Sequence, residues 1–144
     1  MFSKACEYAI KASIFIATQS LLLQKVSLKD VAKAIESPEA YTSKILQQLG
    51  RNLIINSEKG PTGGFSMDKQ QLDRVTLSTI VTAIDGDQIY NGCGLGLRKC
   101  SELMPCPVHH QFKAVRDQLK YMLESTYVKS LTMDVKVGVT FLKV

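Results

Sequence analysis

Residues 27–50 read Ser-Leu-Lys-Asp-Val-Ala-Lys-Ala-Ile-Glu-Ser-Pro-Glu-Ala-Tyr-Thr-Ser-Lys-Ile-Leu-Gln-Gln-Leu-Gly, and their pattern decides the fold. Ser27 is a natural helix N-cap, and apolar residues follow it at helical spacing: Leu28, Val31, Ala32 and Ile35. Ser37-Pro38-Glu39 predicts a second helix start, because a capping hydroxyl, a proline in the first turn and an acid near the positive end of the helix dipole all favour one. Gly50 is placed to end that helix. Two short helices joined by a tight turn match the helix-turn-helix motif.

The second helix of this motif is predicted to have two faces. Its apolar face consists of Tyr41, Ile45, Leu46 and Leu49, and its polar face consists of Glu39, Thr42, Ser43, Lys44, Gln47 and Gln48. In a helix-turn-helix protein the second helix enters the major groove of DNA, where small polar and basic side chains suit base and phosphate contacts. Taken alone, the pattern fits a solvated helix face without DNA contact equally well.

The residues that follow predict a β-hairpin. Leu53, Ile54 and Ile55 are strand formers, residues 59–64 (Lys-Gly-Pro-Thr-Gly-Gly) form a turn, and Phe65-Ser66-Met67 returns as a second strand. A helix-turn-helix followed directly by a hairpin is a winged helix. The tip presents few side chains and leaves N–H groups free for phosphate, so it suits close approach to DNA.

We therefore predict DNA contacts from the second helix and the wing, at Tyr41, Thr42, Ser43, Lys44, Gln47, Lys59 and Thr62. Ser43 and Gln47 are expected to read base edges. Lys44 and Lys59 are expected to neutralise phosphates.

Helices are predicted on both sides of this motif. Residues 4–18 carry an apolar stripe with Lys4, Glu7 and Lys11 outside it, and residues 76–85 carry a second stripe that ends at Gly86. Residues 1–86 are thus expected to form a winged helix-turn-helix DNA-binding domain, in a mainly α fold with a small β wing.

Residues 87–106 are predicted to form a cysteine-rich loop, since Gly and Pro are too frequent there for regular structure. Cys93, Cys100 and Cys106 follow the spacing C-x6-C-x5-C, and His109 comes three residues after Cys106. Thiolates are soft ligands that suit zinc, copper(I) and iron-sulfur clusters, so a metal or redox centre is the first hypothesis. The alternatives are a zinc site, a metal-free thiol switch controlled by disulfides, three unrelated cysteines, or a loop that senses another ligand or partner. Cys6, alone in an apolar helix, is expected to be a buried small hydrophobe.

Residues 107–144 are predicted to hold a dimerisation helix and a C-terminal tail. Apolar residues recur at spacings of four and three, as in a helix that packs along another helix: Val108, Phe112, Val115, Leu119 and Met122. Few residues remain to cover that stripe within one chain, so a homodimer is expected, with packing inside the chain as the alternative. Residues 130–144 alternate weakly and are compatible with either a helix or a strand.

Length and composition narrow the class of protein. A chain of 144 residues buries a core without disulfides, and its longest apolar runs, such as residues 21–23, are too short to span a bilayer. The net charge of +5 is compatible with nucleic-acid binding. The N-terminus has no secretory pattern, so a reducing cytoplasm is the expected location. We do not expect an enzyme, because nothing supplies an orienting group for a nucleophilic cysteine or a phosphate-cradling motif.

The order of these elements resembles the Rrf-type (IscR/NsrR/CymR-like) family of bacterial winged-helix regulators. The resemblance spans roughly residues 1–130 and rests on residues 3–10 (Ser-Lys-Ala-Cys-Glu-Tyr-Ala-Ile), 49–54, the wing at 59–65, 80–86 and the three-cysteine loop. It implies a dimeric repressor or activator of transcription, and we expect a repressor. A two-fold dimer is expected to bind palindromic operator DNA. The resemblance also implies that Cys93, Cys100 and Cys106 ligate a 2Fe–2S or 4Fe–4S cluster, whose state sets the affinity for the operator.

The fourth cluster ligand differs between branches of this family. In one branch it is a histidine three residues after the last cysteine, which matches His109 here. In nitric-oxide-sensing members it is an acid in the first helix of the other subunit, which matches Glu7. This chain departs from the family pattern in its first cysteine interval of six residues and in Thr62, where glycine is common. The first departure leaves the type of sensor open, and the second affects how deeply the wing enters the minor groove.

Overall fold

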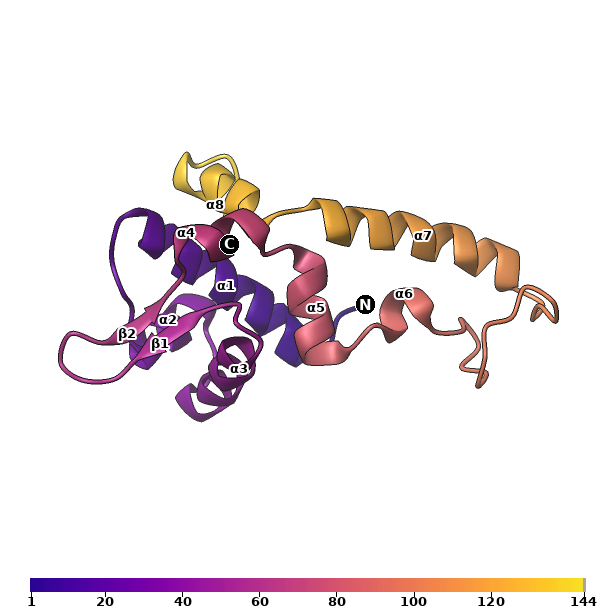
Figure 1. The fold of residues 1–144 in the computed structure, drawn as a ribbon, viewed down its shortest axis with the longest axis horizontal. Helices are drawn as coiled ribbons and strands as arrows, with labels where there is room; N and C mark the ends of the chain where they lie inside the picture. The colour runs from indigo at the N-terminus through magenta and orange to yellow at the C-terminus, as the bar shows by residue number, and fades with distance from the viewer. Residues whose placement is uncertain (144) are drawn as a thin grey trace.

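The computed structural model describes residues 1–143, and it has a helical body from which one long helix projects (Figure 1). The prediction of a mainly α fold with a small β wing is confirmed. Val144, the last residue of the predicted tail, lies outside the described residues. The elements in chain order are α1 (Lys4–Leu21), α2 (Leu28–Ile35), α3 (Glu39–Arg51), β1 (Asn56–Glu58), β2 (Gly64–Ser66), α4 (Lys69–Arg74), α5 (Leu77–Asp85), α6 (Gln88–Asn91), α7 (His109–Ser125) and α8 (Val128–Lys136).

Helix α1 is the centre of the body. Ala9, Ala12 and Ala17 are fully buried, and such small side chains let α2, α3, α5 and α8 pack closely around α1. Most of helix α8 lies in residues 130–144, where the sequence was compatible with either a helix or a strand. This helix buries Val128 in the same core. The core of the winged helix therefore contains residues from both the N-terminal and the C-terminal part of the chain.

The helix-turn-helix begins as predicted at Ser27. The Ser27 hydroxyl accepts a hydrogen bond from the Asp30 backbone N–H at 3.1 Å, and the Asp30 carboxylate accepts one from the Ser27 N–H at 3.0 Å. These two bonds form a capping box, which satisfies backbone donors that a helix start otherwise leaves free. The start of α2 is therefore determined locally, by residues within one turn of each other.

The predicted boundaries of α3 were wrong at both ends. Pro38 is the residue that precedes the helix, and within residues 1–143 the Ser37 hydroxyl has no hydrogen-bond partner, so it does not cap. Gly50 lies inside α3, which ends at Arg51. Leu53 takes the left-handed conformation (φ 57°) that reverses the chain, and its N–H donates to the Gly50 carbonyl at 3.0 Å. The next N–H, from Ile54, donates to the Leu49 carbonyl at 3.0 Å, which completes a Schellman cap without glycine.

The wing starts later than predicted. Ile54 and Ile55, expected in the first strand, are buried core residues that precede it, so the exposed strand β1 consists of Asn56–Glu58 instead. Strand β1 pairs antiparallel with β2, and Phe65 also exchanges backbone hydrogen bonds with Val26, which joins the wing to the start of the helix-turn-helix. At the turn, a Cβ on Gly63 would lie 2.2 Å from the Glu58 carbonyl oxygen. Only glycine fits there, because a Cβ would overlap the Glu58 backbone.

A polar network ties the base of the wing to α4, a helix that was not predicted from the sequence. The Asp68 carboxylate accepts hydrogen bonds from the Gln71 N–H at 2.9 Å and from the Asn56 side-chain amide at 3.1 Å. The Gln71 amide in turn donates to Asn56 and to the Leu53 carbonyl. These bonds hold the pKa of Asp68 below its usual value, with the Gln71 backbone N–H as the largest cause.

This network predicts an acid-sensitive wing base. Because the folded-state pKa of Asp68 is lowered, its carboxylate stabilises the fold above the ordinary Asp pKa of about 4, and that contribution is lost as pH falls through the folded pKa. We expect Asp68→Asn to change stability near pH 7 by only a few tenths of a kcal/mol, since Asn caps about as well as Asp. The variant should lose less stability than the wild type in acid. Urea unfolding from pH 7 to about pH 3 measures this difference, and parallel pH profiles would contradict the assignment.

Helices α5, α6 and α7 carry the cysteine loop away from the body. Helix α5 ends at Gly86, as predicted, and α7 packs back on α5 and α6 through the buried residue Leu123. The segment between α6 and α7 lies at the far end of the projecting helix, at the right of Figure 1. Across residues 1–143, we find no helix with the length and apolar character needed to cross a membrane.

Candidate functional site

The exposed face of α3 presents most of the predicted DNA-contacting residues. Tyr41, Lys44 and Gln47 are exposed, and Ser43 is half-buried beside them. Thr42 does not join them, because it is fully buried and its hydroxyl donates to the Pro38 carbonyl at 2.9 Å. The prediction that Thr42 contacts DNA is therefore corrected. Its spacing from Ile45, Leu46 and Leu49 places it on the apolar stripe of the helix.

A groove of about 350 Å³ lies between α3 and the wing. Ser43 and Gln47 line it from the helix and Lys59 lines it from the wing, so three predicted DNA contacts share one concave surface. Arg51 also lines this groove. Arg51 was not predicted as a DNA contact because the expected helix ended at Gly50. It nevertheless follows Gln47 by four residues on the same helix face. Thr62 is exposed in the turn between the two strands.

The cysteine loop and the start of α7 bring four possible ligand atoms together in two pairs. The Sγ atoms of Cys93 and Cys106 are 3.9 Å apart. The Sγ of Cys100 lies 3.3 Å from Nδ1 of His109, the first residue of α7. Within residues 1–143 no group of three or more His, Cys, Asp or Glu side chains is arranged around one metal position. The loop therefore presents two donor pairs rather than one assembled centre.

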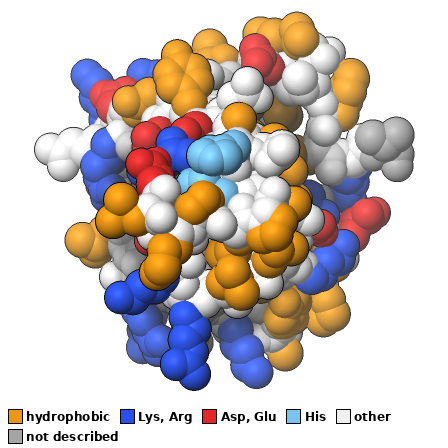
Figure 2. Space-filling model, turned by 90° about the vertical axis from the view of Figure 1, so that its right-hand side faces the viewer, with side chains coloured by type: hydrophobic (Ala, Val, Ile, Leu, Met, Phe, Trp, Pro, Cys, Tyr) orange, Lys and Arg blue, Asp and Glu red, His pale blue; other side chains and the backbone are white. Residues whose placement is uncertain are grey.

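The end of the molecule that carries this loop faces the viewer in Figure 2. The histidine side chains lie near the middle of that face, beside acidic and basic groups. His109 is buried, and in the described part of the chain its Nε2 atom has no hydrogen-bond partner. A buried imidazole nitrogen without a partner is costly unless something else binds it, which suits a ligand nitrogen.

Glu7, the other residue that matches a family ligand, lies on α1. Its carboxylate forms an ion pair with Lys4 at 3.0 Å. Among residues 1–143 it shares no metal-binding group with the cysteines of its own chain. A role of Glu7 as a ligand to the loop of a second subunit stays a prediction.

Arg116 holds the loop against α7 and was not predicted as a site residue. Its Nη2 atom donates to the Cys100 Sγ at 3.2 Å, and its Nη1 atom donates to the Gly92 carbonyl. One guanidinium thus joins two points of the loop. Arg116 follows His109 by seven residues, so both side chains project from the same face of α7. That spacing is a sequence signal that could have identified it.

We predict that Arg116 protects the loop from proteolysis. Trypsin cleaves after Arg98 and Lys99, which are both exposed in the loop. Hydrogen bonds from a charged group contribute about 1.5–3 kcal/mol, so Arg116→Gln should accelerate cleavage there roughly tenfold in the metal-free protein. Gln118→Ala, an exposed change on the same helix, is the matched control and should leave the rate unchanged. Equal rates for both variants would contradict this role.

The thiols of Cys93 and Cys6 differ in pKa. The backbone N–H of Leu95, and next that of Leu97, point at the Cys93 sulfur and hold its pKa below the usual value. By contrast, burial, reinforced by the charge of Asp85, raises the pKa of the Cys6 thiol to about 12. Cys6 is fully buried in the core, so the prediction that it acts as a small hydrophobe is consistent with its surroundings.

Helix α7 exposes an apolar face along the predicted dimer stripe. Phe112, Val115 and Met122 are 43%, 63% and 41% exposed, and Val108 and Leu119 are half-buried. Exposed apolar side chains in a row on one helix mark an interaction surface. The homodimer stays a prediction that this face supports.

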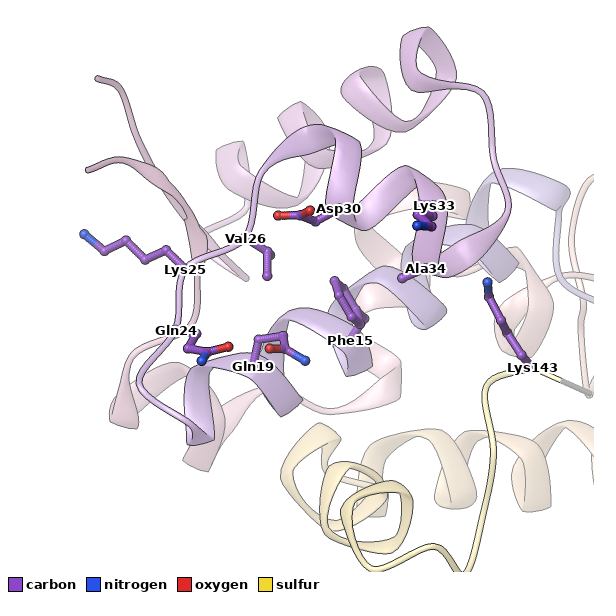
Figure 3. A pocket seen from close by; sticks show the side chains of 9 residues that line it. All are labelled: Phe15, Gln19, Gln24, Lys25, Val26, Asp30, Lys33, Ala34 and Lys143. Carbon is purple, nitrogen blue, oxygen red and sulfur yellow. The ribbon is translucent and has the colours of Figure 1, made fainter. Parts of the chain in front are cut away.

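A hollow of about 420 Å³ lies elsewhere, between α1, α2 and the C-terminal segment (Figure 3). It shares no residue with the α3 groove or with the cysteine loop. Two of its lysines are paired, Lys25 with Glu58 at 2.5 Å and Lys143 with Glu36 at 3.7 Å. These pairs neutralise much of the charge that would attract an anion, so we assign no ligand to the hollow.

Comparison with known proteins agrees with this arrangement. The Rrf2 family, described as an iron-dependent transcriptional regulator, matches residues 2–134. A protein of Aquifex aeolicus (strain VF5) named as an HTH-type transcriptional regulator is 32% identical over 133 residues, which cover 91% of this chain and 90% of that protein. A second such regulator, ORF2 of Azotobacter vinelandii, is 27% identical over 72% of this chain and 66% of its own length.

Solved structures share the fold. CymR, the global cysteine regulator of B. subtilis, superposes with a TM-score of 0.75 at 21% identity, covering 92% of this chain and 96% of CymR. IscR of T. potens superposes with a TM-score of 0.71 at 15% identity, covering 98% of this chain and 93% of IscR. These relatives are regulators of transcription and not enzymes, as expected from the sequence. With the family match over nearly the whole chain, the winged helix and the cysteine loop, the protein belongs to the Rrf2 family of transcriptional regulators.

Proposed function

We propose that this regulator is a DNA-binding homodimer whose operator affinity responds to an iron-sulfur cluster on the cysteine loop. Cys93, Cys100 and Cys106 would hold the cluster, with His109 as the fourth ligand. The observation that carries the proposal is the contact between Cys100 and His109, which pairs a thiol with a buried imidazole 3.3 Å away at the start of α7. The family description as iron-dependent supports it.

The donor set fits such a cluster chemically. Three thiols and one imidazole are ligands that iron-sulfur centres use. Replacing one thiolate ligand by a nitrogen ligand changes the reduction potential of the cluster. When bound, the cluster would supply a redox-active and gas-reactive centre. The protein residues would orient the ligands: Arg116 donates to the Cys100 sulfur, and the Leu95 N–H donates to the Cys93 sulfur.

Binding of duplex DNA would use the groove between α3 and the wing. Gln47 and Ser43 would read bases in the major groove, and Lys44, Arg51 and Lys59 would neutralise phosphates. A two-fold partner paired through α7 would present two such surfaces to a palindromic operator. The expected cytoplasmic location follows from the same proposal, because the operator is chromosomal DNA. Repression, rather than activation, stays a prediction.

The first experiment tests cluster and DNA together. Anaerobic purification, iron and sulfide assays and a visible spectrum on one sample should give iron and sulfide in equal amounts. Selection from a pool of random duplexes should then yield a palindromic site. A colourless protein that holds zinc or no metal after reconstitution would exclude the cluster and leave the DNA-binding half intact.

On the selected site, two substitutions separate base reading from phosphate contact. Gln47→Ala should relax preference at one base pair, at a cost of about 1–3 kcal/mol on the preferred sequence. Lys59→Ala should weaken binding to all sequences and lower the salt slope by about 0.9. Titration of preferred and scrambled duplexes at several salt concentrations gives both quantities. No change for either variant would remove the groove from the DNA interface.

A second candidate is a thiol switch, favoured by the 3.9 Å separation of the Cys93 and Cys106 sulfurs. Small movement would allow a disulfide, in which the two thiols lose two protons and two electrons to an oxidant such as hydrogen peroxide, which is reduced to two waters. Mass spectrometry of the metal-free protein after peroxide treatment would detect this bond. If operator affinity follows the disulfide in protein that never held iron, the switch replaces the cluster as the sensor.

A further inference from the structure

Two lysines and two tyrosines form a compact cluster where α1 meets the first turn of α3. The Nζ atoms of Lys4 and Lys11 lie 5.2 Å and 4.8 Å from the ring centroid of Tyr8. The ring of Tyr41 packs edge-on against Tyr8, with centroids 5.8 Å apart and planes at 81°. Cation–π contacts of this kind hold flexible lysine side chains near one position. We call these four residues the Tyr8 cluster.

The Tyr8 cluster extends the positive charge of the DNA-facing surface. Helix α1 lies outside the helix-turn-helix, yet Tyr8 reaches Tyr41 at the start of α3. At the other end of α3, Arg51 and Lys59 line the groove with the wing. The exposed face of α3 is therefore flanked by cations at both ends. A duplex seated on α3 would run its backbone past each of them, because the phosphates border the major groove on either side.

We propose that the Tyr8 cluster is a phosphate-binding platform that holds one DNA strand beside the groove entered by α3. This inference rests on the proposed DNA-binding function and adds α1 to the interface. The lysine ammonium groups supply charge, and the tyrosine hydroxyls supply hydrogen-bond donors for phosphate oxygens. Because the Tyr8 ring restrains both lysines before DNA arrives, little side-chain freedom is lost on binding.

Glu7 opposes this platform. Its carboxylate is 3.0 Å from the Lys4 ammonium and contributes the negative charge nearest to that lysine. A phosphate that approaches Lys4 must compete with this carboxylate. Removing the charge of Glu7 should therefore strengthen DNA binding in protein that carries no metal, where a role of Glu7 as a cluster ligand has no effect.

The test uses the full-length metal-free protein and a random-sequence duplex about three helical turns long. The Lys4→Gln/Lys11→Gln variant should lower the slope of log affinity against log salt by about 1.8, since each phosphate contact contributes about 0.9. The matched control is Lys120→Gln/Lys136→Gln. It removes the same charge from α7 and α8, and Lys120 also lies over a tyrosine ring, 5.9 Å from the centroid of Tyr90. Its slope should stay near that of the wild type. Thermal melts confirm that all variants fold.

The Glu7→Gln variant should change DNA affinity in the opposite direction. We expect affinity for the same duplex to rise about fourfold at low salt, and the gain to shrink as salt increases. The platform is excluded if the Lys4/Lys11 variant keeps the wild-type salt slope. It is also excluded if the control variant lowers the salt slope as much as the Lys4/Lys11 variant does. In either case the proposal of DNA binding stands. If the wild-type protein binds no duplex in either the metal-free or the reconstituted form, the proposed function fails, and this inference fails with it.

Discussion

A Cys100→Ala variant is expected to lose the visible absorbance of the cluster. After reconstitution its bound iron should be lower than that of the wild type by about tenfold or more. The Cys100 sulfur lies 3.3 Å from Nδ1 of His109 and accepts a hydrogen bond from Arg116 at 3.2 Å. Removing it takes away one ligand and leaves the neighbouring donors unpaired. Because Cys100 is exposed, the melting temperature of the metal-free variant should match that of the metal-free wild type.

Cys6→Ala is the control for this experiment. Cys6 is the one cysteine outside the loop, it is fully buried in the core, and its raised pKa keeps it a neutral thiol. The variant should bind as much iron as the wild type and lose about 1–2 kcal/mol of stability to the small cavity. Full iron retention by Cys100→Ala, measured against this control, would remove Cys100 from the ligand set and favour the Cys93–Cys106 thiol switch.

A Val115→Glu variant is expected to be monomeric. Val115 is 63% exposed on α7, in the middle of the predicted stripe, so the substitution does not disturb the core of one chain. In a two-fold dimer each subunit contributes its residue 115 to the same interface. The substitution therefore places two carboxylates in an apolar interface. That costs about 3 kcal/mol or more per dimer, which raises the dissociation constant by more than about a hundredfold.

Sedimentation equilibrium over a range of protein concentrations measures this change. Ala114→Glu adds the same charge to an exposed position on another face of α7 and should leave the dimer intact. Operator affinity should fall in parallel for Val115→Glu, because two linked half-site contacts become one. A wild-type protein that is monomeric at all concentrations would instead assign the α7 face to another partner.

Much of the fold could be predicted because its signals act over short distances. The Ser27–Asp30 capping box spans three residues, and the glycine at position 63 is required by the Glu58 carbonyl across a single turn. The end of α3 was predicted wrongly because a glycine is the usual signal for a left-handed cap, whereas here Leu53 takes that conformation. Burial of Ile54 and Ile55 in the core holds it there, and a sequence pattern does not report that constraint.

Some residues of the candidate sites could likewise be predicted from the sequence, and others could not. The three cysteines and His109 could be singled out by spacing and residue chemistry, and Gln47 and Lys59 by their place in the motif. Thr42 was misassigned because its polarity outweighed its position on the apolar stripe. Arg116 was missed because its role depends on where the loop folds back, not on its neighbours in the chain.

The sequence by itself determined the winged helix, the donor types of the cysteine loop and the family, since helix periodicity, capping and turn chemistry arise from residues a few positions apart. Only the tertiary structure decided which cysteines pair, that α8 completes the core around α1, and that Tyr8 meets Tyr41 beside the recognition helix. The physical reason is that these contacts join residues far apart in the chain. Their geometry follows from the packing of whole helices and from no local pattern.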